Sequence, residues 1–229
     1  RAGQLMINPD AVQISLNNDP AAFGPPRDFD VTITGDARSG TAALTEMLVS
    51  QTGGDKPCWA DDLDDIRARA HERIAALEPQ LGYATALRDA MPDDTCLVNE
   101  LTQVGYVSRY SLPIHHPRSY IDPGYQGTLG YGYPTAIGAA VGNPDRPVVS
   151  VTGDGGFGYG MSEMATVMNY DIPLVCVLFR DNAFGNVQRM HKQQFDGDHH
   201  GTELTNPDML QLAAAYDMDG YRAEGPDDL

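Results

Sequence analysis

Three short apolar runs, separated by segments with helical periodicity, constrain the fold of this chain more than any other feature. The runs cover residues 95–100, 147–152 and 172–179, and each has the length and apolar content of a strand buried on both faces. Strands that alternate with helices are typical of a parallel sheet with helices packed on both sides. We therefore predict an α/β fold built on a doubly wound parallel sheet with helices on both faces.

The helices between these strands have recognisable ends. The second half of segment 124–144 predicts a helix, with Pro134 near its start and Gly142 where a C-terminal stop belongs. Residues 160–170 predict another helix, and two helical patterns precede the first strand. Ligands of open parallel sheets bind at the carboxyl ends of the strands, so we expect the loops that follow the three strands to carry the function.

Residues 1–50 predict a separate unit. Strand patterns at 11–16 and 29–35 precede an amphipathic helix pattern, which is too little structure for a core of its own. We interpret this unit as the end of an α/β domain that begins upstream, so we expect the chain to be part of a longer protein. Residues 51–75 are expected to form a linker and connecting helix. Residues 76–229 would then form the main domain, incomplete at its C-terminus.

Composition argues against several partners. Fifteen Lys and Arg residues against 32 Asp and Glu residues give a formal net charge of −17, which is unfavourable for binding nucleic acid or an anionic membrane. No apolar run approaches the roughly 20 residues that span a bilayer. The cysteines Cys58, Cys96 and Cys176 are odd in number and far apart, so we expect reduced thiols in a cytoplasmic protein.

The stretch "GDGGFG" at 153–158 predicts a bound phosphate. Its glycines expose backbone amides at the start of a helix, a common phosphate site. Asp154 would repel a phosphate unless a divalent cation lay between them, and no Lys, Arg or His occurs between Arg146 and Arg180. Mg²⁺ prefers carboxylate and phosphate oxygens. We therefore predict a metal-bridged phosphate, with a second ligand at Asp181, 27 residues after Asp154.

"GDG" followed by "RDNAFGN" resembles the cofactor signature of thiamine diphosphate enzymes, in which "GDG" precedes a pair "NN". The resemblance covers about residues 80–229 and is similar to the group of acetolactate synthases and benzoylformate decarboxylases. "VTITGDARSGTAALTEML", at 31–48, resembles the end of the Rossmann-like middle domain of that family. The resemblance implies the thiamine diphosphate-binding fold, with thiamine diphosphate and Mg²⁺ as cofactors.

The resemblance leaves two assignments of the metal ligands open. In one register the ligands are Asp154, Asp181 and the main-chain carbonyl of Ala183. In the other, Asn182 replaces Asp181 and the carbonyl is that of Phe184. The spacing from Asp154 and the preference of Mg²⁺ for carboxylate oxygen favour the first assignment.

The resemblance also implies a set of cofactor contacts. They are Leu101, Thr102, Gln103, Gly127, Thr128, Leu129, Gly153, Asp154, Gly155, Gly156, Asp181, Ala183, Phe184, Gly185 and Asn186. Leu129 would hold the cofactor bent, and the carbonyl of Gly127 would accept a hydrogen bond from its aminopyrimidine, so these two positions are the catalytic ones. Without the resemblance, Leu129 would be interpreted as ordinary core.

Several positions depart from the family pattern. Val104 stands in place of a histidine, and Arg180 in place of a neutral residue. Val187 stands where pyruvate decarboxylases carry a glutamate, and Met190 replaces the tryptophan of acetolactate synthases. The differences at Val187 and Met190 indicate a substrate other than those of pyruvate decarboxylases and acetolactate synthases. The histidines of segment 191–203 lack the spacing of a zinc site and are expected in a solvated active-site loop, where one could meet substrate.

We therefore predict a thiamine diphosphate- and Mg²⁺-dependent decarboxylase or carboligase that acts on a 2-oxo acid. The resemblance implies a homodimer or homotetramer whose active site is shared, because the activating glutamate comes from an N-terminal domain of the partner subunit. One alternative is a non-catalytic cofactor-binding homologue or regulatory subunit. A less favoured alternative is a Rossmann-type nucleotide binder, because that fold needs an acidic residue about 20 residues after its glycine motif, at a strand end.

Overall fold

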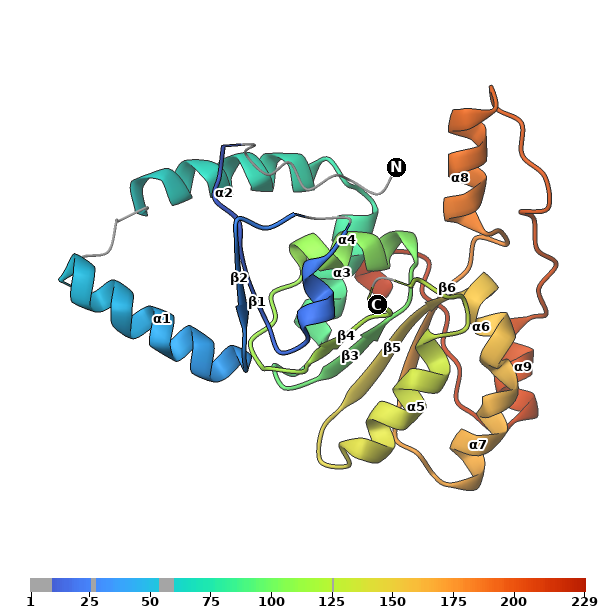
Figure 1. The fold of residues 1–229 in the computed structure, drawn as a ribbon. Coiled ribbons are helices and arrows are strands. Elements are labelled where there is room, and N and C mark those ends of the chain that lie inside the picture. The colour runs from blue at the N-terminus through green and yellow to red at the C-terminus, as the bar shows by residue number, and fades with distance from the viewer. Residues whose placement is uncertain (1–9, 26–27, 54–59, 125) are drawn as a thin grey trace. The chain divides into compact units, whose positions relative to one another are not determined.

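The computed structural model describes residues 10–25, 28–53, 60–124 and 126–229 (Figure 1). The chain divides into two compact units between Asp64 and Asp65. Helix α2 (Ala60–Ala75) crosses this division. The expected domain boundaries at residues 50 and 75 lie on either side of it and remain an expectation.

The N-terminal unit contains the two expected strands and the expected helix. Strands β1 (Ile14–Asn17) and β2 (Val31–Thr34) pair in parallel. Helix α1 (Ala37–Thr52) begins where the side chain of Asp36 accepts a hydrogen bond from the amide of Ser39, at 2.9 Å. None of the described residues of this unit is buried, so its apolar side chains form no core among themselves.

The described part of the C-terminal unit is built on a four-stranded parallel sheet with strand order β4-β3-β5-β6. Its strands are β3 (Cys96–Asn99), β4 (Tyr120–Ile121), β5 (Val148–Gly153) and β6 (Val175–Phe179). The three apolar runs of the sequence form β3, β5 and β6, which confirms the prediction of a parallel sheet. Strand β4 was not predicted, because two residues carry no periodicity.

Helices cover both faces of this sheet (Figure 1). The described helices of this unit that follow α2 are α3 (Gln80–Ala90), α4 (Gln103–Ser111), α5 (Gly132–Gly142), α6 (Asp154–Gly160), α7 (Met164–Asn169), α8 (Gly185–Gln194) and α9 (Met209–Ala215), with 3₁₀ turns at Met161–Glu163 and Pro226–Asp228. Helix α8 projects from the domain in Figure 1. Within the described ranges, no helix is long and apolar enough to cross a membrane.

Alternation along the strands divides the core into two layers. Leu97 of β3 and Val149 of β5 face the α3 and α4 side, where they pack with Leu87. Val98 of β3 faces the opposite side and packs against Ala136 of α5. Both faces of the sheet are therefore apolar and covered, which confirms the doubly wound arrangement.

The glycine-rich stretch differs from its prediction. We expected a loop at 153–158 and a helix at 160–170, but helix α6 begins at Asp154 and a 3₁₀ turn separates it from α7. Glycine disfavours helix in isolation, and here packing overrides that preference. Phe157 is buried, and a β-carbon on Gly156 would overlap the carboxylate of Glu100.

Candidate functional site

The carboxyl ends of β3, β5 and β6 meet at one edge of the sheet, because the three strands are adjacent and parallel. Glu100 follows β3, Asp154 follows β5 and Asp181 follows β6 closely. A cavity of about 420 Å³ lies at this edge, and all three residues line it. Its volume falls in the range of small-molecule and cofactor sites, roughly 300–1,000 Å³.

The cavity brings together most of the residues singled out in the sequence. Those that line it are Leu101, Thr102, Gln103, Gly127, Leu129, Gly153, Asp154, Gly155, Gly156, Asp181, Ala183, Phe184, Gly185 and Asn186. Thr128 and Asn182 are not among its described lining residues. Other lining residues were not anticipated, namely Pro79, Gln80, Tyr83, Glu100, Tyr106 and Phe179.

Asp154 is a buried carboxylate at the start of α6, and only 2% of it is exposed. One carboxylate oxygen accepts a hydrogen bond from the amide of Gly155 at 2.9 Å. The other accepts two bonds of 2.7 Å, from the amide of Asn182 and from Nδ2 of Asn206. Burial raises the pKa of Asp154, and the nearby charge of Asp181 adds to this effect, although the hydrogen bonds oppose it. A cation at this position would relieve the cost of the buried charge.

The side chain of Asp181 lies beside the first residues of α8. Its Oδ1 accepts a hydrogen bond from the amide of Ala183 at 3.1 Å. A β-carbon on Gly185 would overlap Oδ2 of Asp181, so this side chain depends on glycine at the start of α8. Asp181 and Ala183 thus line the cavity from the same turn, whose Asn182 amide binds Asp154.

Asn182 makes a different set of contacts. Its backbone is left-handed, with φ 56°, a conformation that Asn tolerates better than most residues. Its Oδ1 accepts hydrogen bonds from Nε of Arg180 at 2.9 Å and from Nδ2 of Asn206 at 3.2 Å. The carboxamide of Asn182 is therefore hydrogen-bonded to neighbouring side chains. One of these, Arg180, lines the cavity.

The start of α4 offers backbone donors to the cavity. Oγ1 of Thr102 accepts a hydrogen bond from the amide of Gly105 at 2.8 Å and so caps the helix. The amides of Gln103 and Val104, in the first turn, have no acceptor within an α-helix and suit an anion. The Val104 side chain is 4% exposed and belongs to the apolar core, so this position gives the cavity no polar side chain.

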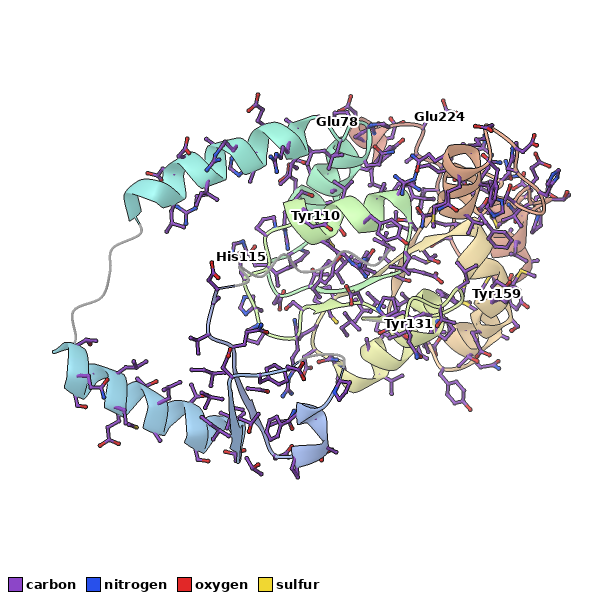
Figure 2. The ribbon with its side chains drawn as sticks, turned by 45° about the horizontal axis from the view of Figure 1, so that its top comes forward. Glu78, Tyr110, His115, Tyr131, Tyr159 and Glu224 are labelled. Carbon is purple, nitrogen blue, oxygen red and sulfur yellow. The ribbon has the colours of Figure 1, made fainter. Side chains whose placement is uncertain are left out.

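Leu129 borders the cavity from loop 126–131. It is 42% exposed, so the interpretation of Leu129 as ordinary core is wrong. Leu101 packs against Gly127, where a β-carbon would overlap its side chain. The loop ends at Tyr131, labelled in Figure 2, whose hydroxyl donates a 3.2 Å hydrogen bond to the carbonyl of Asp122.

The family model that describes the thiamine pyrophosphate enzyme C-terminal TPP-binding domain matches residues 102–229, more than half of the chain. The chain belongs to this family. Thiamine pyrophosphate is another name for thiamine diphosphate, so the match agrees with the "GDG" resemblance. The matched residues, with their loops, form most of the cavity wall.

The chain is similar to known proteins over most of its length. It is 29% identical over 96% of its length to a probable acetolactate synthase large subunit of Methanocaldococcus jannaschii, and 34% identical over 94% to a probable 2-ketoarginine decarboxylase of Pseudomonas aeruginosa. It spans 39% and 38% of these relatives, about two fifths of their length. A solved thiamine diphosphate-dependent 4-hydroxybenzoylformate decarboxylase from Rhodococcus jostii aligns over 65% of this chain and 28% of its own, with a TM-score of 0.60 and 29% identity.

The cavity fits the diphosphate of such a cofactor. Gln103 and Val104, at the start of α4, line it together with Asp154, whose carboxylate is buried. An anion beside a carboxylate is stable only when a cation lies between them. The donor set is therefore suited to a diphosphate that arrives with a divalent metal ion.

Helix α8 contributes its first residues to the cavity wall, whereas none of residues 191–203 is among the described lining residues. Val187 lines it, whereas Met190 is 45% exposed and is not among the described lining residues. Nε2 of His199 lies 3.2 Å from a carboxylate oxygen of Glu203, at the surface. Nowhere in the described ranges do three or more His, Cys, Asp or Glu side chains gather as a metal site.

Two side chains at this site, Glu100 and Asn206, were missed in the sequence. Glu100 ends a buried strand much as Asp154 does, so the rule that pointed to Asp154 could have pointed to it. Asn206 lies 52 residues after the carboxylate that it binds, and no local pattern marks it.

Proposed function

We propose that this chain is part of a thiamine diphosphate- and Mg²⁺-dependent enzyme that decarboxylates a 2-oxo acid, as a lyase or as an acetolactate synthase-like carboligase. The observation that carries the proposal is the pair of carboxylates, Asp154 and Asp181, which line one cavity together with the start of α4. When bound, thiamine diphosphate supplies the electron sink for decarboxylation. The protein supplies position, charge compensation and shielding from water.

The metal ligands in this proposal are Asp154, Asp181 and the carbonyl of Ala183. All three residues line the cavity, and a hydrogen bond within the same turn orients Asp181. The alternative ligand, Asn182, already accepts hydrogen bonds from two side chains. These contacts support Asp181 as the second ligand.

The apolar wall at loop 126–131 has a separate role in the proposal. Leu129 would hold the cofactor bent, and the carbonyl of Gly127 would accept from its aminopyrimidine. The position of Leu129 supports this role, because its side chain borders the cavity and is not buried in the core. By holding the cofactor in this shape, Leu129 would supply a proximity effect in the reaction.

The whole protein is proposed to act as a homodimer or homotetramer with an active site shared between subunits, in the cytoplasm. Cys96 and Cys176 are free thiols, which is typical of a reducing compartment. Val187 and Met190 differ from the residues of pyruvate decarboxylases and acetolactate synthases, so we propose a substrate other than theirs.

The test is a substrate panel on the intact protein, freed of cofactor and then reloaded with thiamine diphosphate and Mg²⁺. Pyruvate, 4-hydroxybenzoylformate and 2-ketoarginine are offered, and CO₂ release and carboligation products are measured. We expect CO₂ release from at least one 2-oxo acid, dependent on both additions. Tight cofactor binding without CO₂ release across a wide panel would favour the non-catalytic homologue instead.

A further inference from the structure

Glu100 is a buried carboxylate to which the proposed function gives no task. It follows β3, and only 2% of it is exposed. One carboxylate oxygen, Oε1, accepts a hydrogen bond from the amide of Gly130 at 2.6 Å. The other, Oε2, accepts one from the hydroxyl of Thr152. Both carboxylate oxygens are therefore engaged within the protein.

Three glycines make room for this side chain and its backbone. A β-carbon on Gly156 would overlap the Glu100 carboxylate, and one on Gly132 would lie 2.7 Å from Cβ of Glu100. A β-carbon on Gly105 would overlap the Glu100 carbonyl oxygen. The amide of Glu100 donates to the carbonyl of Val151 at 2.8 Å, which holds its backbone to β5. Because several elements approach Glu100 this closely, the surrounding structure fixes the position of its side chain.

The two hydrogen-bond partners of Glu100 lie next to, or two residues from, lining residues at two different parts of the cavity. Gly130 directly follows Leu129 in loop 126–131. Thr152 lies on β5, two residues before Asp154. Gly130 has a left-handed backbone, with φ 82°, and Tyr159 of α6 (Figure 2) covers it, so the turn has little freedom to find another partner for its amide.

We propose that Glu100 is a positioning residue that fixes loop 126–131, and with it Leu129, relative to the Asp154 turn. This inference rests on the proposed function for its consequence, because a fixed Leu129 matters only if a bent cofactor binds there. The link itself acts through Gly130 and Thr152, and Glu100 contacts neither proposed carboxylate ligand in the hydrogen bonds of the structure. Its loss should therefore affect reactivity more than affinity.

The first readout is amide hydrogen exchange of the intact protein without cofactor. In Glu100→Ala, the Gly130 amide loses its acceptor, so we expect its exchange to accelerate by about tenfold or more. Glu100→Gln should keep the protection, because its oxygen can accept from Gly130 while its NH₂ group donates to the Thr152 hydroxyl. Thr152→Val should give an intermediate effect.

Ser150→Ala is the matched control. Ser150 lies on β5 two residues before Thr152, is fully buried, and its hydroxyl has no hydrogen-bond partner among the described residues. Its loss tests general loosening of the core without touching Glu100. We expect Gly130 exchange in Ser150→Ala to stay within about twofold of the native rate.

The second readout separates affinity from reactivity. Thiamine diphosphate affinity is measured by calorimetry with Mg²⁺, and deuterium exchange at the reactive carbon of the cofactor by NMR. For Glu100→Ala we expect affinity within about threefold of native and deuterium exchange slower by about tenfold or more, with rescue in Glu100→Gln. If Glu100→Ala does not fold, affinity and deuterium exchange are compared in Thr152→Val instead, where we expect smaller effects of the same kind.

Two results would overturn the positioning role. One is native-like exchange of the Gly130 amide in folded Glu100→Ala, and the other is an equal loss of affinity and deuterium exchange. A native protein that binds no thiamine diphosphate would refute the proposed function instead. Even then, amide exchange would decide whether Glu100 holds the loop, since it is measured without cofactor.

Discussion

The two ends of the cavity are built in opposite ways. At the end formed by Asp154 and Asp181, charge is concentrated, and three hydrogen bonds hold the buried Asp154 carboxylate. At the end formed by Gly127 and Leu129, the wall is apolar, partly exposed, and tied to the sheet through Glu100. The difference suggests a division of labour, in which the charged end sets cofactor affinity and the apolar end sets reactivity.

The largest expected effect is at the charged end. Asp154→Ala should weaken Mg²⁺-dependent binding of thiamine diphosphate by roughly a hundredfold or more, because losing one partner of a buried charge typically costs about 3 to 5 kcal/mol. Calorimetric titration measures it, with Asp145→Ala, an exposed carboxylate in the loop before β5, as the control. Unchanged affinity in Asp154→Ala would mean that Asp154 does not bind a metal ion that bridges to the diphosphate.

The second effect separates the two candidate ligands. Asp181→Ala should lower cofactor affinity by about tenfold or more, and Asn182→Ala by about threefold or less. Because Asn182 has φ 56°, Asn182→Gly is a second variant that avoids backbone strain from alanine. If either Asn182 variant is damaged more than Asp181→Ala, the ligand role passes to Asn182.

The third effect belongs to the apolar end. Leu129→Ala should leave affinity within about threefold, while deuterium exchange at the reactive carbon of the cofactor slows by about tenfold or more. Leu129→Met, which nearly conserves volume, should stay close to native. Equal losses of affinity and exchange, or no loss of either, would mean that this wall does not shape the cofactor.

The smallest effect concerns stability without cofactor. Burial raises the pKa of Asp154, so the stability that its protonated form contributes is fully present below the ordinary value of 3.8 and is lost as pH rises through the raised pKa. The side chain in Asp154→Asn stays uncharged at every pH. The free energy of unfolding of this variant, minus that of the native protein, should therefore increase with pH over that window and then level off. Denaturant unfolding between about pH 4 and pH 8 measures the difference. A difference that does not vary with pH would mean that the folded protein does not shift the pKa of Asp154.

The sheet was predictable because its strands are apolar over their whole length. Residues 95–100, 147–152 and 172–179 each read as a strand buried on both faces, and they formed β3, β5 and β6. The same local patterns pointed to Asp154, an acid among glycines at a strand end. Strand β4 is too short to show a pattern. Helix α6 is helical in spite of its glycines, because its Phe157 is buried and its Gly156 packs against Glu100.

The remaining parts of the site depend on contacts between distant segments. Asn206 reaches Asp154 across 52 residues, and Glu100 reaches Gly130 and Thr152 across 30 and 52 residues. Sequence order does not reveal such pairs, since side-chain partners follow from the packing of whole elements. The exposure of Leu129 has the same origin, because the sequence alone does not show which apolar side chains border a cavity.

The most direct test of the division of labour measures affinity and deuterium exchange on the same samples of native protein, Asp154→Ala and Leu129→Ala. We expect Asp154→Ala to lose affinity but to approach native exchange per bound cofactor at saturating thiamine diphosphate. Leu129→Ala should keep affinity and lose exchange. If the two quantities instead fall in proportion in both variants, the two ends of the cavity do not have separate roles and the account is contradicted.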